Sequence, residues 1–155
     1  MKGNEKVLET LNHLLIDELT AISQYMVHAE MCAAWGYGKL GDVTEKRAID
    51  EMKHAEKLIG RIIFLEGRPT VSTLNPMRIM GDVLSQFQAD HSAEEGAIAA
   101  YNAGIRLCSD QGDAGSRELM TAILADEEAH IDWLETQLDQ VAQMGIQNYL
   151  VAQVE

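Results

Sequence analysis

Two stretches of this sequence repeat one pattern: Asp50-Glu51-Met52-Lys53-His54 and Asp126-Glu127-Glu128-Ala129-His130. Residues three apart lie on one face of a helix, so each stretch places a glutamate beside a histidine. Two further glutamates, Glu18 and Glu94, precede these stretches by the same number of residues. The sequence therefore holds two halves with the same arrangement of potential metal ligands.

The residues around these stretches predict helices. Apolar residues recur at helical spacing, strong helix formers dominate, and the only prolines are Pro69 and Pro76. The segment 67–81 is long for a link between adjacent helices, and it predicts a crossover to the opposite end of a bundle. We expect a single all-α domain over residues 1–155, a four-helix bundle with a short fifth helix. The predicted helices cover residues 5–35, 39–66, 82–110, 113–144 and 146–153.

Composition and charge narrow the possible partners. The formal net charge of −13 favours cations and argues against a nucleic-acid surface, which needs a basic face. The residues at the N-terminus lack the apolar stretch of a signal peptide, and no segment approaches the ~18 apolar residues of a membrane span. A cytoplasmic protein that does not bind membranes is therefore expected.

Several residues with reactive side chains have no partner at ligand spacing. Cys32 and Cys108 are isolated in the sequence, so we interpret both as small apolar residues of the core or of an interface. His13, His28 and His91 are interpreted as surface or interface residues.

The two repeated halves together predict a di-iron site. Burying a carboxylate costs several kcal/mol, so four without counter-ions would exceed the roughly 5–15 kcal/mol of a domain's stability. Two divalent cations balance four carboxylates, and carboxylate with imidazole suits ferrous iron and dioxygen better than zinc. Two single glutamates and two Glu-x-x-His pairs are the ligands of ferritin-like di-iron bundles. The predicted ligands are Glu18, Glu51, His54, Glu94, Glu127 and His130, with Glu51 and Glu127 bridging.

Neighbouring polar residues are expected to support the ligands. A carboxylate commonly accepts a hydrogen bond from a ligand imidazole. We expect Asp126 to contact His54 and Asp50 to contact His130, each across the two halves. Tyr25 could hydrogen-bond a ligand and donate an electron during oxygen reduction, with simple packing as the alternative. Tyr101 is expected to pack or to form a hydrogen bond.

With these ligands in place, the sequence resembles the bacterioferritin family over nearly its whole length. The resemblance implies a hollow 24-subunit shell with a ferroxidase centre inside each subunit. It also implies a haem b at the twofold interface between subunits. The segments that carry it are Met1-Lys2-Gly3, residues 18–25, 49–55, 64–67 and 126–135, and Asn148-Tyr149-Leu150.

The haem prediction depends on Met52. A helix turns about 100° per residue, so Met52 points away from the interior that Glu51 faces. A twofold interface would bring two copies together, and two thioethers could then ligate one haem iron. An apolar interface contact is the alternative interpretation. The expected walls of the haem pocket are Leu19, Ile22, Met26 and Ile59.

The sequence departs from the family at Lys46. Many members have a histidine there, which forms an iron site on the inner surface of the shell together with the residue equivalent to Asp50. A charged lysine cannot be a ligand. Iron could instead pass through the centre by movement of His130, and the sequence leaves both routes open.

The expected function is iron storage and detoxification by a ferroxidase that oxidises Fe(II) with dioxygen or hydrogen peroxide. A small ferredoxin is the expected reductant for iron release. The alternatives are a rubrerythrin-like di-iron oxidase or peroxidase that stores nothing, and a non-catalytic interaction bundle. The preferred oxidant, the haem occupancy, a homomeric or mixed shell and the phosphate content of the mineral stay open.

Overall fold

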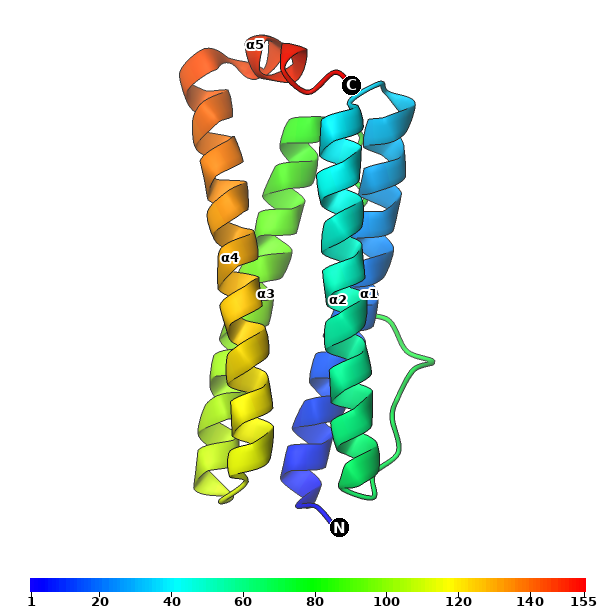
Figure 1. Ribbon diagram of the computed structural model, residues 1–155, viewed down its shortest axis with the longest axis vertical. Coiled ribbons are helices and arrows are strands. Elements are labelled where there is room, and N and C mark those ends of the chain that lie inside the picture. The colour runs from blue at the N-terminus through cyan, green and yellow to red at the C-terminus, as the bar shows by residue number, and fades with distance from the viewer.

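The fold is a bundle of two antiparallel helical hairpins (Figure 1). The computed structural model describes residues 1–155. One hairpin pairs α1 with α2, the other pairs α3 with α4, and α5 lies across the end of the bundle near the C-terminus. The prediction of an all-α four-helix bundle with a long crossover and a short fifth helix is confirmed. The helices are α1 (Glu5–Ala34), α2 (Gly38–Phe64), α3 (Val83–Asp110), α4 (Ala114–Met144) and α5 (Ile146–Val151).

Side-chain caps define where three of the helices begin. Asn4 accepts hydrogen bonds from the backbone N–H groups at the start of α1, and Asp82 and Asp113 do the same for α3 and α4. Such caps satisfy donors that have no partner within the helix. Asp82 and Asp113 were predicted as the first helical residues, and each proves to be the cap that precedes its helix.

Two helices end two residues earlier than predicted. The helix expected over 39–66 ends at Phe64, because Glu66 adopts a left-handed backbone with φ 61°. Gly67 N–H then donates to the Ile62 carbonyl at 2.9 Å, a bond that closes the helix end. The helix expected over 146–153 ends at Val151, because the next two N–H groups bond to carbonyls only three residues back.

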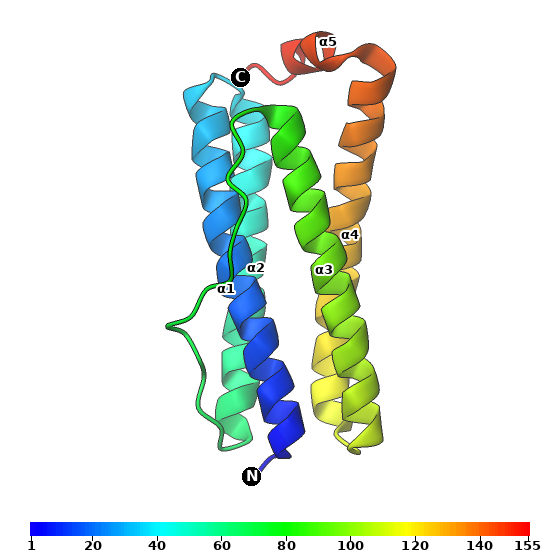
Figure 2. The same ribbon diagram turned by 180° about the vertical axis from the view of Figure 1, so that it is seen from behind.

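The crossover of residues 65–82 runs back along α1 (Figure 2). Backbone N–H groups of the crossover donate to polar side chains that form a stripe on α1. These contacts attach the segment to α1 along much of its length. The donors are Thr70, Asn75, Arg78 and Met80, and the acceptors are Asn12, Thr20, Gln24 and His28 respectively, at 2.7–3.1 Å.

The crossover explains why one histidine prediction was wrong. His28, expected at the surface or an interface, is buried with only 1% of its surface exposed. Its Nε2 accepts the Met80 N–H, and its Nδ1 lies 2.9 Å from Asp90 Oδ1. A neutral ring with its proton on Nδ1 satisfies both partners. The periodicity of α1 gave no sign that a second segment covers its outer face.

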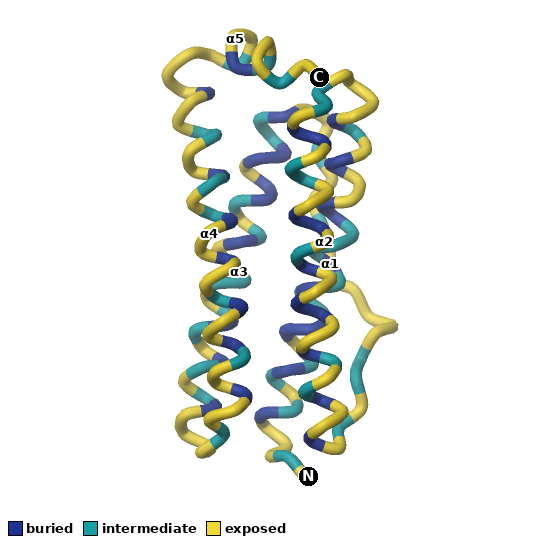
Figure 3. The backbone as a smooth tube through the Cα atoms, viewed as in Figure 1, coloured by how far each residue is buried: buried dark blue, intermediate teal, exposed yellow.

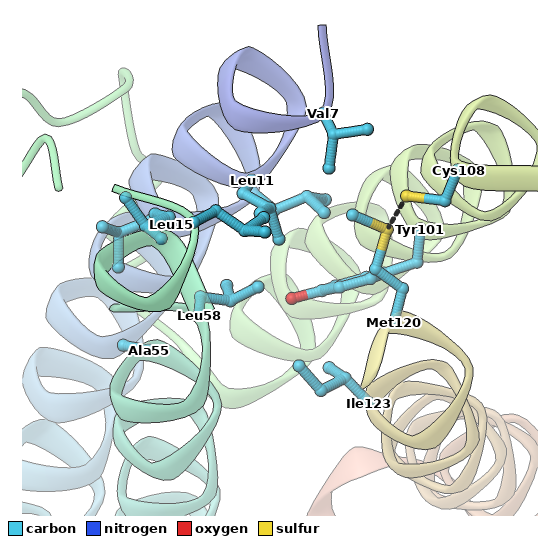
Figure 4. Packing of buried hydrophobic residues seen from close by; sticks show 12 residues of the cluster. Val7, Leu11, Leu15, Ala55, Leu58, Tyr101, Cys108, Met120 and Ile123 are labelled. Carbon is cyan, nitrogen blue, oxygen red and sulfur yellow. Dashed lines mark hydrogen bonds between the residues drawn. The ribbon is translucent and has the colours of Figure 1, made fainter. Parts of the chain in front are cut away.

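Two apolar clusters fill the ends of the bundle, and a buried polar layer separates them. Buried and exposed residues alternate along each of the long helices (Figure 3). The first includes Leu11, Leu58 and Ile123, and Figure 4 shows it from close by. The second surrounds Phe87 and Leu134 near α5. Cys108 belongs to the first cluster and Cys32 to the second, so of the two predicted places for the cysteines, the core or an interface, the structure shows the core. No helix carries an apolar stretch that could cross a bilayer.

Candidate metal centre

The polar layer between the clusters contains the six predicted ligands. α1 and α3 contribute one glutamate each, and α2 and α4 each contribute a glutamate and a histidine one turn apart. All six are buried, with at most 7% of any of them exposed. The structure therefore brings together every residue that the sequence pattern selected. They are Glu18, Glu51, His54, Glu94, Glu127 and His130.

Ligand atoms of these residues form two overlapping groups. Glu18 and His54 belong to one group, Glu94 and His130 belong to the other, and Glu51 and Glu127 belong to both. The atoms of each group lie within 4.8 Å of one another, close enough to surround one ion. The shared carboxylates are the two that were predicted to bridge.

Six buried atoms at this centre lack a hydrogen-bond partner, one from each of the six residues. They include both Nδ1 atoms, although His54 Nδ1 is 2.9 Å from Glu127 Oε1 and His130 Nδ1 is 3.0 Å from Glu51 Oε1. Leaving a buried polar atom unpaired costs about 1–3 kcal/mol, more if it is charged. Oxygen and imidazole atoms converging without protein partners fit divalent iron, which takes this mixture of ligands.

The carboxylates of the centre ionise unusually. Burial, followed by the neighbouring Glu94 side chain, raises the pKa of Glu127 to about 9. Burial and the proximity of Glu18 likewise raise the pKa of Glu51 well above its usual value. Burial opposes ionisation of Glu94 too, but hydrogen bonds with Glu127, His130 and Tyr25 lower its pKa. Without cations the centre therefore retains protons near neutral pH, and cations bind in competition with them.

Each histidine turns one nitrogen inward and the other toward an aspartate. His54 Nε2 is 2.9 Å from Asp126 Oδ2, and His130 Nε2 is 3.4 Å from Asp50 Oδ2. The predicted contacts across the two halves are confirmed. An aspartate that accepts the Nε2 proton leaves the Nδ1 lone pair free to face a metal ion.

Two tyrosines contact the unshared glutamates. The Tyr25 hydroxyl donates to Glu94 Oε1 at 2.6 Å, and the Tyr101 hydroxyl donates to Glu18 Oε1 at 2.5 Å. In both glutamates the other oxygen, Oε2, is the atom without a partner. Each tyrosine therefore fixes its carboxylate while leaving one oxygen free. The hydrogen bonds predicted for Tyr25 and Tyr101 are confirmed.

Arg47 is a neighbour of the centre that the sequence interpretation missed. Its side chain is buried, and its Nη1 is 4.0 Å from Glu94 Oε1. Arg47 precedes Glu51 by one helical turn, so it lies on the same face of α2. That spacing was the available signal. Lys46, which precedes Arg47 in the chain, is exposed to solvent.

A cavity of about 330 Å³ lies beside the centre and touches all four of its carboxylates. Its walls come from all four long helices, and from Asn75 and Pro76 of the crossover. Asp17, beside Glu18, adds an acidic side chain to the lining. The cavity offers an acidic approach to the centre for small ions and molecules.

Met52 lies on the face of α2 that points away from the metal centre, and 44% of its surface is exposed. It borders an apolar groove of about 240 Å³ between α1 and α2. Of the expected pocket walls, Ile22 and Met26 line this groove. Leu19 and Ile59 do not line this groove and, like Ile22, pack against the apolar core, so their place in a haem pocket stays a prediction. The remaining lining residues are Ala29, Glu30, Glu45, Ala48 and Ile49.

The bundle, its crossover and its paired Glu-x-x-His groups define a ferritin-like protein. The family model described as a ferritin-like domain matches residues 8–144. Bacterioferritin of Brucella melitensis is 45% identical over 149 residues, which cover 96% of this chain and 92% of the relative. Bacterioferritin of Streptomyces coelicolor is 43% identical over 155 residues, 100% of this chain and 93% of the relative. This chain belongs to the bacterioferritin family.

Proposed function

We propose that this chain is the subunit of a 24-subunit iron-storage shell and that each copy is a ferroxidase. It would oxidise Fe(II) with dioxygen or hydrogen peroxide and retain the ferric product as mineral inside the shell. Membership of the bacterioferritin family supports storage. The observation that carries the ferroxidase proposal is the set of six buried ligand atoms without protein partners, in two overlapping groups.

The residues of the chain prepare two adjacent positions for Fe(II). Glu51 and Glu127 belong to both positions, so they hold the two ions at one fixed separation. Two ferrous ions held in this way supply two electrons to one molecule of oxidant. The aspartates orient the histidine rings, and the tyrosines fix the unshared glutamates before any ion arrives. Protons held by Glu51 and Glu127 leave as the ions bind.

Tyr25 is the proposed source of an additional electron. Reduction of dioxygen to water needs four electrons. One pair of ferrous ions supplies two and Tyr25 would supply the third, so the fourth must come from a further Fe(II) ion, which is the substrate. The Tyr25 hydroxyl already donates to Glu94 Oε1 at 2.6 Å, so loss of an electron can accompany transfer of its proton to that carboxylate. Tyr101 has the same contact with Glu18, and it remains a positioning residue in this proposal.

The two histidines differ in a way that favours passage of iron past His130. His130 is 7% exposed and lies 3.4 Å from Asp50, whereas His54 is 1% exposed and lies 2.9 Å from Asp126. The more exposed and less closely held ring moves more easily. With Lys46 in place of a possible ligand, we propose that iron leaves the centre on the His130 side.

We also propose that Met52 and its symmetry mate ligate a haem b at a twofold interface. The groove fits such a group, because an exposed thioether borders an apolar surface lined by Ile22, Met26 and Ile49. Thioether ligation would raise the haem potential and suit the group for electron transfer. A small ferredoxin is the proposed donor, with electrons passing through the haem to the mineral for iron release.

The first prediction tests the ferroxidase. Glu94→Ala or Glu127→Ala should leave the shell assembled but abolish the fast phase of Fe(II) oxidation, because neither variant retains a complete pair of positions. Stopped-flow absorbance would measure oxidation, and sedimentation velocity would measure assembly and mineral content. Glu128→Ala, a change at an exposed residue of the same helix, is the control. Fast oxidation at the wild-type rate in either variant would remove the proposed site, and oxidation without retained mineral would favour the rubrerythrin-like alternative.

A further inference from the structure

The internal repeat of the chain fails at two buried charged positions near the metal centre. A constant offset relates Glu18 to Glu94, Tyr25 to Tyr101 and Glu51 to Glu127. The same offset pairs Arg47 with Ile123. It also pairs Asp90 with Leu14, but Asp90 Oδ1 is engaged by Gln24 at 2.8 Å and by His28 at 2.9 Å and forms no ion pair with Arg47. A buried cation in one half therefore corresponds to a buried hydrocarbon in the other. The two halves, alike in their ligands, differ in the charge beside them.

Arg47 lies against the half of the centre formed by Glu94. Only 9% of the residue is exposed, and its Nη1 approaches Glu94 Oε1 at 4.0 Å. The guanidinium carbon sits 5.5 Å from the centre of the Trp133 ring, which covers it on another side. An arginine stays protonated at all relevant pH values, so this is a fixed positive charge. Little water is available here to screen it.

Ile123 gives the other half a different environment. It is fully buried in the apolar cluster that includes Leu58 and Tyr101 (Figure 4). The ion pairs of Glu18 include no arginine or lysine. Glu18 therefore has a tyrosine hydroxyl and a histidine as neighbours, whereas Glu94 has these and a guanidinium.

We propose that Arg47 makes the two cation positions unequal, so that the position of Glu18 and His54 fills first and the position of Glu94 and His130 binds more weakly. This inference rests on the proposed two-ion function. Two divalent cations already balance the four carboxylates, and Arg47 adds a positive charge beyond that balance on one side. A cation at the Glu94 position must therefore bind near the positive charge of Arg47, whereas a cation at the Glu18 position has no such charge beside it.

Titration of the metal-free assembled protein with Co²⁺ tests the proposal without any catalytic turnover. Visible absorption and calorimetry would follow binding in parallel. The wild type should bind two ions per chain in two steps, the second at least about tenfold weaker than the first. Glu94→Ala should retain the tight step, and Glu18→Ala should retain only the weak one. Two equal steps, or the opposite assignment, would overturn the inference.

Substitutions at Arg47 separate its charge from its packing. Arg47→Ile copies the residue of the other half, and it should bring the two affinities within about threefold by strengthening the weaker step. Arg47→Lys keeps the charge and should keep two separate steps, even if Arg47→Ile proves too unstable to assemble. Lys46→Gln removes an exposed, solvent-screened charge from the same helix and should leave both steps unchanged. A weaker second step in Arg47→Ile would mean that the guanidinium supports Glu94 as a ligand, contrary to the proposal.

The number of Co²⁺ ions bound tests the proposed two-ion centre, and the ratio of their affinities tests the role of Arg47. Binding of fewer than two ions per chain by the wild type would contradict the two-ion centre itself. Two ions bound with equal affinity would leave that centre intact and remove only the role of Arg47.

Discussion

Folding changes the ionisation of Glu127, and this change affects the stability of the protein. Burial and the Glu94 carboxyl raise its pKa from 4.5 in the reference state to about 9. Between these values the folded protein binds a proton that the unfolded chain has released. The stabilisation from this proton is fully present below pH 4.5 and is lost as the pH rises toward 9. Glu51, whose pKa is also raised, acts in the same direction.

The second prediction follows from this loss of stability as the pH rises. The melting temperature of the metal-free protein should fall between pH 5.5 and 8.5, and a saturating divalent cation should remove the fall, because it replaces the protons. Differential scanning calorimetry at both pH values would measure it. In Glu127→Gln the residue at this position cannot titrate, so the fall should become smaller. An equal fall in wild type and variant would place the titrating group elsewhere.

Residue spacing predicted the contacts of this centre better than it predicted the surroundings. A step of three along a helix is enough to place Glu51 with His54, and the repeat extends the same logic to the other half. Arg47 was missed because the repeat that selected the ligands has an apolar residue, Ile123, at the matching position. His28 was placed wrongly because its partners, Met80 and Asp90, lie on segments whose approach no helical periodicity describes.

At the scale of elements, Gly67 after the end of α2 lies in close contact with two apolar side chains. A Cβ added to Gly67 would lie 2.4 Å from Leu8 Cδ2 and 3.0 Å from Ile62 Cγ2. By contrast, a Cβ added to Gly60, on the exposed face of the same helix, would meet nothing within 4 Å. The two glycines therefore differ in what they contribute, although both belong to this region of the chain.

The third prediction compares these two positions. Gly67→Ala should destabilise the protein by about 1–3 kcal/mol, because Leu8 and Ile62 must shift in a packed core. Gly60→Ala should stabilise it by about 0.5–1 kcal/mol, because alanine favours a helix more than glycine does. Urea unfolding of the metal-free protein would measure both changes. A stabilising Gly67→Ala would show that the contact with Leu8 relaxes without strain.

Element positions were predictable to within two residues because apolar periodicity, glycines and the two prolines agree along the chain. The remaining errors come from local chemistry at the ends. Asp82 and Asp113 cap helices instead of starting them, and Glu66 takes the left-handed backbone at the end of α2. The crossover itself was predicted from its length and prolines, but its attachment to α1 was not. Side chains on one element that bond the backbone of another leave no periodic signal.

At the scale of the whole molecule, the exposed face around Met52 is the surface where we propose that a second copy of the chain docks. The helical phase of α2 correctly predicted that Met52 points away from the interior. The extent of the groove was only partly predictable, because it depends on how α1 packs against α2. Ile22 and Met26 border it as expected and Leu19 does not, although both Ile22 and Leu19 also pack against the apolar core.

The fourth prediction concerns this face. Met52→Leu keeps the apolar volume but removes the sulfur, so the purified shell should assemble and lack the haem Soret band. Its Fe(II) oxidation should be little changed, because Met52 is outside the metal centre, and reductive release of iron should slow. Met26→Leu alters another methionine of the same groove and should retain haem. An unchanged haem spectrum in Met52→Leu would require withdrawal of the proposed ligation.

The burial of both cysteines also makes the protein suitable for site-specific chemical labelling. Cys32 is 2% exposed and Cys108 is fully buried, and burial raises the pKa of each thiol, to about 11 for Cys32. Thiolates are the reactive form, so neither native sulfur competes well for a maleimide at neutral pH. A cysteine introduced at an exposed position such as Glu128 would then be the single attachment point on each chain. The native sequence thus permits a dye or a tether to be placed without first removing any of its own thiols.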